Sequence, residues 1–323
     1  MTRIISGRLI VSIVVPVLNE EETVHVFLQK VDDVRARCCD AIHPEIEFEY
    51  IFVNDGSEDR TLAVLLDEQQ QNPWIKIVDL SRNFGKECAL SAGIDIATGN
   101  VVIPIDVDLQ DPPELIVSML SAWQDGNEVV LARRISRDDD TSLKRLTARL
   151  FYKCHNSISR TKIPENVGDY RLMDRIVVDA LKTLPENRRF MKGLFAWVGF
   201  KTIAVDYARA PRTAGKTKFS GVSLWSLAVE GFTSFSTAPL IIWTYVGLIV
   251  SLISFCFALL VIIQKVLMGI SIPGYAALSV AIFFLGGVQL MGIGILGEYL
   301  GRVYSEVKRR PVYLVKKVYE GNK

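Results

Sequence analysis

The chain has 323 residues, 50% of them hydrophobic, and a formal net charge of +1. Its length exceeds that of one typical domain, so we expect two regions. A nearly neutral chain offers no field that attracts nucleic acid, and we expect no nucleic-acid partner. The 5 cysteines are odd in number and lack CxxC spacing, which favours free thiols over a disulfide framework or a zinc site.

Strands and helices alternate through the first two hundred residues. Apolar runs of strand length lie at 9–17, 48–54, 75–81, 101–106 and 128–132. Between these runs, apolar residues recur at helical spacing, and one helix is expected to begin at Pro112–Pro113, where proline is tolerated. The alternation predicts an α/β fold with a doubly wound, mainly parallel sheet, whose ligands bind beyond the carboxyl ends of the strands.

Polar residues gather where four of these strands end. The first strand is followed by Asn19 and Glu20, the second by Asp55, the third by Arg82 and Lys86, and the fourth by Asp106 and Asp108. A single cluster of this kind could be a helix cap. Four clusters on one edge of a sheet predict a binding site.

The fourth cluster, "DVDLQDPPE", predicts a metal site. Asp106 and Asp108 are two residues apart at the end of a strand, so their carboxylates can turn toward one point. They would repel each other unless a hard divalent cation, Mg²⁺ or Mn²⁺, lay between them. That ion would bridge to phosphate oxygens, and Arg82 and Lys86 would add positive charge for a diphosphate. The alternative for an isolated Asp-x-Asp pattern is a solvated acidic turn.

Two uncharged stretches in the last third of the chain are long enough to be membrane spans. The segments 238–264 and 275–299 each contain an uncharged core longer than the ~20 residues that a spanning helix needs. We expect a two-helix transmembrane hairpin, with an interfacial amphipathic helix before it at 219–237 and a basic tail after it at 300–323. Basic residues flank both outer ends, which places both termini and the domain over 1–218 in the cytoplasm.

Three further segments are less specific. The stretch 188–200 carries Arg189 and Lys192, which suit lipid headgroups or an acceptor phosphate. The charged stretch 133–145 is either a solvated loop or a mobile lid. "GIGILG" matches GxGxxG but lies in an uncharged span after no strand, so its glycines predict close helix approach, within the hairpin or in a homo-oligomer.

Several motifs resemble those of the family 2 (GT-A) polyisoprenyl-phosphate glycosyltransferases. They are "NDGSEDRT", "SRNFGKE", "DVDLQDPPE", "VGDYRLMDR", "RFMKGLFAWVGF" and "RTAGKTKF". The resemblance is strongest to the bactoprenol glucosyltransferases that serve O-antigen glucosylation, and it covers almost the whole chain. It implies a multi-pass enzyme of the bacterial inner membrane, with its catalytic domain and both termini in the cytoplasm.

The resemblance also implies roles for individual residues. Pro16, Asn19, Glu20 and Asp55 would hold the nucleoside, while Arg82, Lys86, Asp106, Asp108 and Gln110 would complete the donor site and its metal. Asp169 and Asp108 would be the catalytic acids, and Arg133, Arg189, Lys192, Arg212 and Lys218 would meet the acceptor or its phosphate. The chain has Asn54 where many relatives have an acid. For Asp169 a structural role remains open, as a helix cap or as a partner of Arg171.

The activity implied is inverting transfer of a sugar from a nucleotide diphosphate to undecaprenyl phosphate. UDP-glucose is the preferred donor, with GDP-mannose or UDP-aminoarabinose as alternatives. The acceptor phosphate is already anionic, so the enzyme needs to position it and stabilise the leaving diphosphate rather than supply a strong base. A processive polysaccharide synthase would need more spans and a QxxRW motif, and a non-enzymatic scaffold would leave the four polar clusters unexplained.

Overall fold

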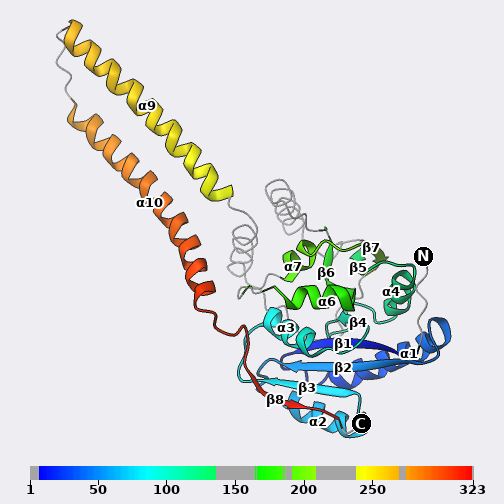
Figure 1. The fold of residues 1–323 in the computed structure, drawn as a ribbon. Coiled ribbons are helices and arrows are strands. Elements are labelled where there is room, and N and C mark those ends of the chain that lie inside the picture. Colours follow the sequence, from blue (N-terminus) through cyan, green and yellow to red (C-terminus); the bar gives the residue numbers. More distant parts are fainter. Residues whose placement is uncertain are drawn as a thin grey trace.

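The computed structural model describes residues 7–135, 164, 166–184, 186, 191–208, 238–268 and 274–321. Eight strands form one sheet in the order β7-β5-β6-β4-β1-β2-β3-β8 (Figure 1). The strands are β1 (Leu9–Val17), β2 (Ile46–Asn54), β3 (Ile75–Leu80), β4 (Val101–Pro104), β5 (Val129–Arg134), β6 (Val167–Asp174), β7 (Thr202–Tyr207) and β8 (Val315–Tyr319). The helices are α1 (Val24–Ala41), α2 (Thr61–Gln71), α3 (Lys86–Ile96), α4 (Leu115–Gln124), α6 (Arg175–Lys182), α7 (Met191–Trp197), α9 (Ala238–Met268) and α10 (Tyr275–Val307).

The centre of the sheet is parallel, as the sequence predicts. β1 pairs with β2 and β4, and β2 pairs with β3, all in parallel register. These strands are buried on both faces, which is why they read as continuous apolar runs rather than as alternating patterns. The carboxyl ends of β1, β2, β3 and β4 therefore meet at one edge of the sheet.

The outer part of the sheet is mixed, while β5 and β7 run in the same direction as the four central strands. β6 lies between β4 and β5 and runs antiparallel to both, while β7 runs parallel to β5. α6 begins at Arg175, and Asp174 caps it by accepting a 3.0 Å hydrogen bond from the Ile176 amide. The segment around Asp169 is therefore a strand.

Helices cover both faces of the sheet, as expected of a doubly wound fold (Figure 1). Apolar side chains of α1, α2 and α4 pack into one core, with Phe27 and Phe52 meeting edge to face at 6.1 Å between ring centroids. Side chains of α3, α6 and α7 pack into the second core on the opposite face.

The helices α9 and α10 form a long hairpin that extends away from the sheet (Figure 1). Gly292 makes their close approach possible, since a Cβ there would lie 2.0 Å from Nε1 of Trp243. Among the described residues, one helical segment, Phe284–Val307, is long and apolar enough to cross a membrane. The apolar segment Ile242–Phe257 of α9 is shorter than such a span.

The C-terminal segment does not form a separate tail over 300–323. α10 continues to Val307, and β8 then pairs antiparallel with β3, with Val78 opposite Val318. The sheet therefore gains its eighth strand from residues that follow the hairpin. The expected interfacial helix at 219–237 lies outside the described residues, as do 136–145 of the charged stretch.

Candidate active site

The carboxyl edge of the sheet brings together four loops that are far apart in the sequence. They follow β1, β2, β3 and β4, and β6 adds Asp169 from the antiparallel part of the sheet. Ligands of doubly wound sheets bind at such an edge. The sequence predicts this placement from the strand ends alone.

A single lysine occupies the centre of this edge. Nζ of Lys86, the first residue of α3, lies 2.7 Å from Oδ1 of Asp106 and 3.1 Å from Oδ2 of Asp169. Burial alone would lower the pKa of Lys86, but the two carboxylates outweigh burial and raise it. Burial also raises the pKa of Asp106, which the Lys86 ammonium opposes and the nearby carboxylates of Asp169 and Asp108 reinforce. Lys86, which the sequence places at a diphosphate, thus forms ion pairs with two carboxylates of the site.

Asp108 lies on a turn with an unusual backbone. Its Oδ1 accepts a 3.1 Å hydrogen bond from the amide of Gln110, and Leu109 between them has a φ of 56°. A leucine in this left-handed region is strained by about 1–2 kcal/mol, and such strain is typical of functional sites. Oε1 of Gln110 is buried without a hydrogen-bond partner among the described residues.

The chemistry of these side chains fits a hard divalent ion that the substrate helps to bind. Among the described residues there is no group of 3 or more His, Cys, Asp or Glu side chains that could hold a metal without other ligands. A pair of carboxylates, Asp106 and Asp108, is nevertheless what Mg²⁺ commonly uses, with waters and substrate phosphates as its remaining ligands.

Asp55 holds the loop after β3 against the loop after β2. Its carboxylate accepts hydrogen bonds of 2.7 and 2.9 Å from the amides of Phe84 and Gly85. Gly56, with a φ of 70°, packs so closely that a Cβ would lie 2.5 Å from the Asn83 nitrogen. Burial raises the pKa of Asp55, although the two amides and Arg82 act in the opposite direction. Asp55 thus shapes the predicted nucleoside site.

The neighbouring Asn54 is paired with a buried acid. Its Nδ2 donates a 2.8 Å hydrogen bond to Oδ1 of Asp79, which is buried at the end of β3. An aspartate in its place would put two carboxylates together without that donor. Asn54 is therefore held in place by Asp79, a residue that no local sequence pattern marks.

The loop after β1 is fastened to the loop after β2. Asn19, with a φ of 54°, accepts a 2.8 Å hydrogen bond from the Glu58 amide, and the Glu20 amide donates to Oγ1 of Thr61 at 2.8 Å. Pro16 lies in β1 opposite Val53, one pair before the strands end. These residues therefore border the loop that carries Asp55.

Arg82 lies at the exposed side of the same region. Its guanidinium stacks on the ring of Phe84 at 4.0 Å and donates a 2.8 Å hydrogen bond to the Asn83 carbonyl. It therefore remains within its own loop, next to the amides that bind Asp55.

The structure brings Arg134, rather than the predicted Arg133, close to the acidic loop. Arg133 forms an exposed bidentate pair with Asp206, at 2.6 and 2.9 Å. Arg134 points to the other face of β5, where Nη2 lies 3.5 Å from Oδ1 of Asp111 and Nε donates to the hydroxyl of Tyr207 at 3.0 Å. Strand alternation separates the two arginines, but an apolar run buried on both faces gives no signal of which one faces the site.

Asp169 has no role as a helix cap, since it lies within β6 and Asp174 caps α6. Arg171 donates to the carbonyls of Gly168 at 2.7 Å and Asp169 at 3.3 Å. Its guanidinium also stacks on Phe195 at 3.9 Å. Burial lowers the pKa of Arg171 to about 10, although the charge of the nearby Asp169 carboxylate acts to raise it. The carboxylate of Asp169 is directed to Lys86, at the same edge as the acidic pair.

The remaining predicted residues are not placed by the structure. Arg189, Arg212 and Lys218 lie outside the described residues. Lys192 lies on α7, but its side chain is outside the described part. Their roles toward acceptor and phosphate stay predictions.

Known proteins resemble this chain over most of its length. A family model described as "Glycosyl transferase family 2" matches residues 12–182. The SfII prophage-derived bactoprenol glucosyl transferase of Shigella flexneri is 52% identical over 312 residues, covering 97% of this chain and 99% of that protein. An uncharacterized glycosyltransferase of Synechocystis sp. is 54% identical over 306 residues, covering 94% of each.

A solved structure matches part of the chain more distantly. The glucosyl-3-phosphoglycerate synthase of Mycobacterium tuberculosis, in complex with Mn²⁺, UDP and phosphoglyceric acid, covers 70% of this chain and 77% of that chain. Its sequence identity is 19% and the TM-score is 0.49.

The matched segment contains the loops that form the carboxyl edge, with Asp55, Lys86, Asp106, Asp108 and Asp169. The protein is a glycosyltransferase with a mixed α/β sheet of the GT-A type. On the family match and the high identity over nearly the whole length of its relatives, the chain belongs to glycosyl transferase family 2.

Proposed function

We propose that the protein transfers a sugar, with glucose from UDP-glucose as the preferred case, to undecaprenyl phosphate. The observation that carries this proposal is the cluster of Lys86, Asp106 and Asp169 at the carboxyl edge of the sheet. The chain that leaves α10 joins the sheet again through β8, beside β3. The names of similar proteins support the substrate class, because the Shigella flexneri relative is a bactoprenol glucosyl transferase.

The acidic pair would hold the donor diphosphate. Asp106 and Asp108 are suited to a divalent cation, which when bound would neutralise charge on the leaving diphosphate. Asp55 and its bound amides would form the floor of the nucleoside site. Lys86 lies 2.8 Å from Oδ2 of Asp106, so it holds that carboxylate in a fixed position beside the reacting groups.

Asp169 would act on the acceptor side. Asp169 and Asp106 contact the same Lys86 ammonium. Asp169 would therefore be close enough to the donor to orient an incoming phosphate or to take the residual proton of that phosphate. The acceptor phosphate needs little activation, so most of the rate enhancement would come from holding it in line with the sugar carbon and from excluding water.

The path of the chain supports a membrane hairpin with both outer ends on one side. α9 follows β7 and α10 precedes β8, and both strands belong to the same sheet. The chain must therefore leave and re-enter the sheet from the same side of any membrane it crosses. With the basic residues around the hairpin, this supports a cytoplasmic domain and cytoplasmic termini at the bacterial inner membrane.

The short segment between α10 and β8 supports a lipid acceptor. The carbonyl of Leu314 accepts a 2.9 Å hydrogen bond from the Ser81 amide, directly after β3 ends. Residues 308–314 can span at most about 25 Å. If α10 spans the bilayer, the carboxyl edge of the sheet lies within that reach of the membrane surface, where a polyprenyl phosphate would present its headgroup.

A panel of radiolabelled nucleotide sugars would test the proposal. Membranes containing the protein would receive UDP-glucose, UDP-aminoarabinose or GDP-mannose, with and without added undecaprenyl phosphate. We expect label in the lipid extract from UDP-glucose, increased by the added acceptor. Preferential labelling from GDP-mannose would reassign the donor, and an absence of lipid product from every sugar would contradict the proposal.

A further inference from the structure

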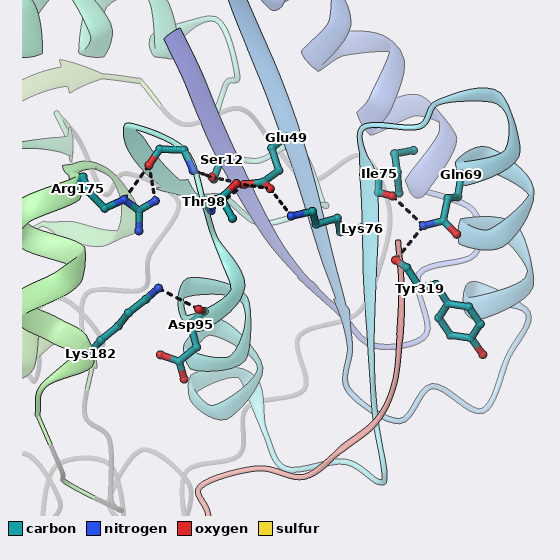
Figure 2. Close-up of polar contacts among 11 residues, drawn as sticks. Ser12, Glu49, Gln69, Ile75, Lys76, Asp95, Thr98, Arg175, Lys182 and Tyr319 are labelled. Atoms are coloured by element: carbon teal, nitrogen blue, oxygen red, sulfur yellow. Dashed lines mark hydrogen bonds and ion pairs between the residues drawn. The ribbon is translucent and has the colours of Figure 1, made fainter. Parts of the chain in front are cut away.

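The C-terminal segment Tyr313–Tyr319, here called the C-terminal strap, lies beside β3 and supplies the outermost strand on that side of the sheet (Figure 1). It follows α10 after a sharp turn in which Arg309 has a φ of 47°. Its far end is held by Gln69, whose Nε2 donates to the carbonyls of Ile75 at 2.8 Å and Tyr319 at 2.9 Å (Figure 2). The strap therefore connects α10 directly to the sheet.

An irregularity in the strand pairing brings one strap side chain to a carboxylate of β3. Val315 lies opposite Leu80 and Lys317 opposite Asp79, so Lys316 is the extra residue of a bulge. Bulges of this kind redirect a side chain. Nζ of Lys316 lies 3.4 Å from Oδ2 of Asp79, although the lysine side chain is 67% exposed and that of the aspartate only 4%. Lys316 thus supplies a cation to a buried carboxylate.

Asp79 connects the strap to the loop after β2. Its other oxygen accepts the 2.8 Å hydrogen bond from Asn54, and Oδ1 of Asn54 accepts a 3.2 Å hydrogen bond from the Ser57 amide. Asn54 directly precedes Asp55, which binds the amides of the neighbouring loop. A change at Lys316 would therefore reach the predicted nucleoside site through two hydrogen bonds.

Two further contacts connect the strap to the loop after β3 and to α3. The Leu314 carbonyl accepts the Ser81 amide at 2.9 Å, at the start of the loop that leads to Gly85. The hydroxyl of Tyr313 donates a 2.7 Å hydrogen bond to Oδ2 of Asp95, in the last turn of the helix that begins with Lys86. All three contacts lead to elements of the candidate active site.

We propose that the C-terminal strap is a positioning element of the donor site, and that Lys316 is its main positioning residue. The inference rests on the proposed function in taking this edge as the nucleotide-sugar site. Removing Lys316 would leave the carboxylate of Asp79 buried without this cation, which disfavours the arrangement that holds Asn54. The strap thereby makes the order of the donor loops depend on the segment that emerges from α10.

The test compares two adjacent lysines in the full-length protein. Lys317→Ala removes the same charge from the same strand, but Lys317 lies over the ring of Tyr319 at 4.4 Å rather than at Asp79. We expect Lys316→Ala to raise KM for the nucleotide sugar about fivefold, the low end for coupling between sites, with little change in kcat. Lys317→Ala should match the wild type, and Lys316→Arg should restore the wild-type KM.

A second comparison separates this coupling from general loss of stability. In an Asp79→Asn background the buried charge is gone, so adding Lys316→Ala should have no further effect on KM. Equal effects of Lys316→Ala and Lys317→Ala, or an undiminished effect of Lys316→Ala in the Asp79→Asn background, would overturn the inference.

Amide hydrogen exchange provides a measurement that does not need the donor. Residues 54–57 and 81–86 should exchange faster in Lys316→Ala than in Lys317→Ala, and unchanged protection would overturn the inference. If exchange rises as expected but the wild type binds no UDP-sugar, the proposed function fails while the link between strap and loops stands.

Discussion

The ammonium of Lys86 lies between Asp106 and Asp169, 2.7 Å from one carboxylate and 3.1 Å from the other. Asp106 follows a parallel strand of the sheet and Asp169 lies on an antiparallel one. One cation therefore connects the acid expected at the donor diphosphate with the acid expected at the acceptor. The catalytic roles of these residues can be separated by substitution.

Asp169→Asn should impair turnover without impairing the fold. The carboxylate faces Lys86 from a strand and caps no helix, so an amide of the same size keeps the local packing. We expect kcat to fall at least ~10²-fold, the low end for a lost acid or base, with UDP-glucose affinity and melting temperature near those of the wild type.

Asp174→Ala is the matched control for Asp169→Asn. Asp174 caps α6 and also accepts a 2.7 Å hydrogen bond from Nε1 of Trp123, so its loss should lower stability by about 0.5–2 kcal/mol. The kcat of the folded Asp174→Ala variant at 25 °C should stay near the wild-type value. Wild-type turnover in Asp169→Asn, or a loss of stability as large as that in Asp174→Ala, would show that Asp169 is structural.

Glu49 should make the free energy of unfolding depend on pH under acidic conditions. It is buried in β2, with Nζ of Lys76 2.6 Å from Oε1 and further hydrogen bonds from Ser12 and Thr98 (Figure 2). Burial alone would raise the pKa of Glu49, but these donors outweigh burial and lower the pKa from 4.5 to about 2. Because the folded state has the lower pKa, the stabilisation is present above the unfolded pKa and is lost as pH falls toward 2.

Glu49→Gln should therefore lower the free energy of unfolding by about 3 kcal/mol at pH 7 and by about half of that at pH 3. Denaturant unfolding at both pH values measures the difference. Glu68→Gln serves as the control, since Glu68 forms a surface pair with exposed His25 that should contribute no more than about 1 kcal/mol. A cost for Glu49→Gln that is independent of pH would refute the role of its charge.

Gly292→Leu should disrupt the helical hairpin. The indole of Trp243 occupies the space that a side chain at 292 would need, whereas nothing lies within 4 Å of a Cβ at Gly294. Overpacking typically costs about 1–3 kcal/mol, so the melting temperature in detergent should fall for Gly292→Leu and change little for Gly294→Leu. Equal effects of the two substitutions would argue against this helix contact.

The topology can be tested with single cysteines in a cysteine-free chain. We expect Arg310→Cys, just after α10, to be protected from a membrane-impermeant maleimide in intact cells. Ser271→Cys, between α9 and α10 in the sequence, should be labelled from the outer side. Labelling of position 310 in intact cells would contradict a hairpin with both outer ends in the cytoplasm.

The sequence predicts the parallel half of the fold and most of its polar edge for one physical reason. Strands buried on both faces read as apolar runs, and each run ends at a polar loop, so Asp55, Lys86, Asp106 and Asp108 are found by position alone. The antiparallel strand β6 lacks this signal. β6 contains Arg171, which is buried because backbone carbonyls and Phe195 satisfy its charge, and hydropathy cannot anticipate such partners.

The C-terminal strand could not be anticipated either. "VKKVY" is short, basic and exposed, and its partner β3 lies more than two hundred residues earlier in the chain. The same limit applies to Asp79, whose importance depends on Asn54 and Lys316. Contacts between distant segments, rather than local patterns, decide these parts of the site.

The transfer assay with Asp108→Asn tests the central claim most directly. Purified protein in vesicles containing undecaprenyl phosphate would be given radiolabelled UDP-glucose with Mn²⁺ or Mg²⁺, and label in the lipid extract would be measured. We expect lipid-linked sugar from the wild type, its loss on chelation of the divalent ion, and a fall of at least ~10²-fold in Asp108→Asn at unchanged melting temperature. Undiminished product from the variant, or from the wild type after chelation, would contradict the account.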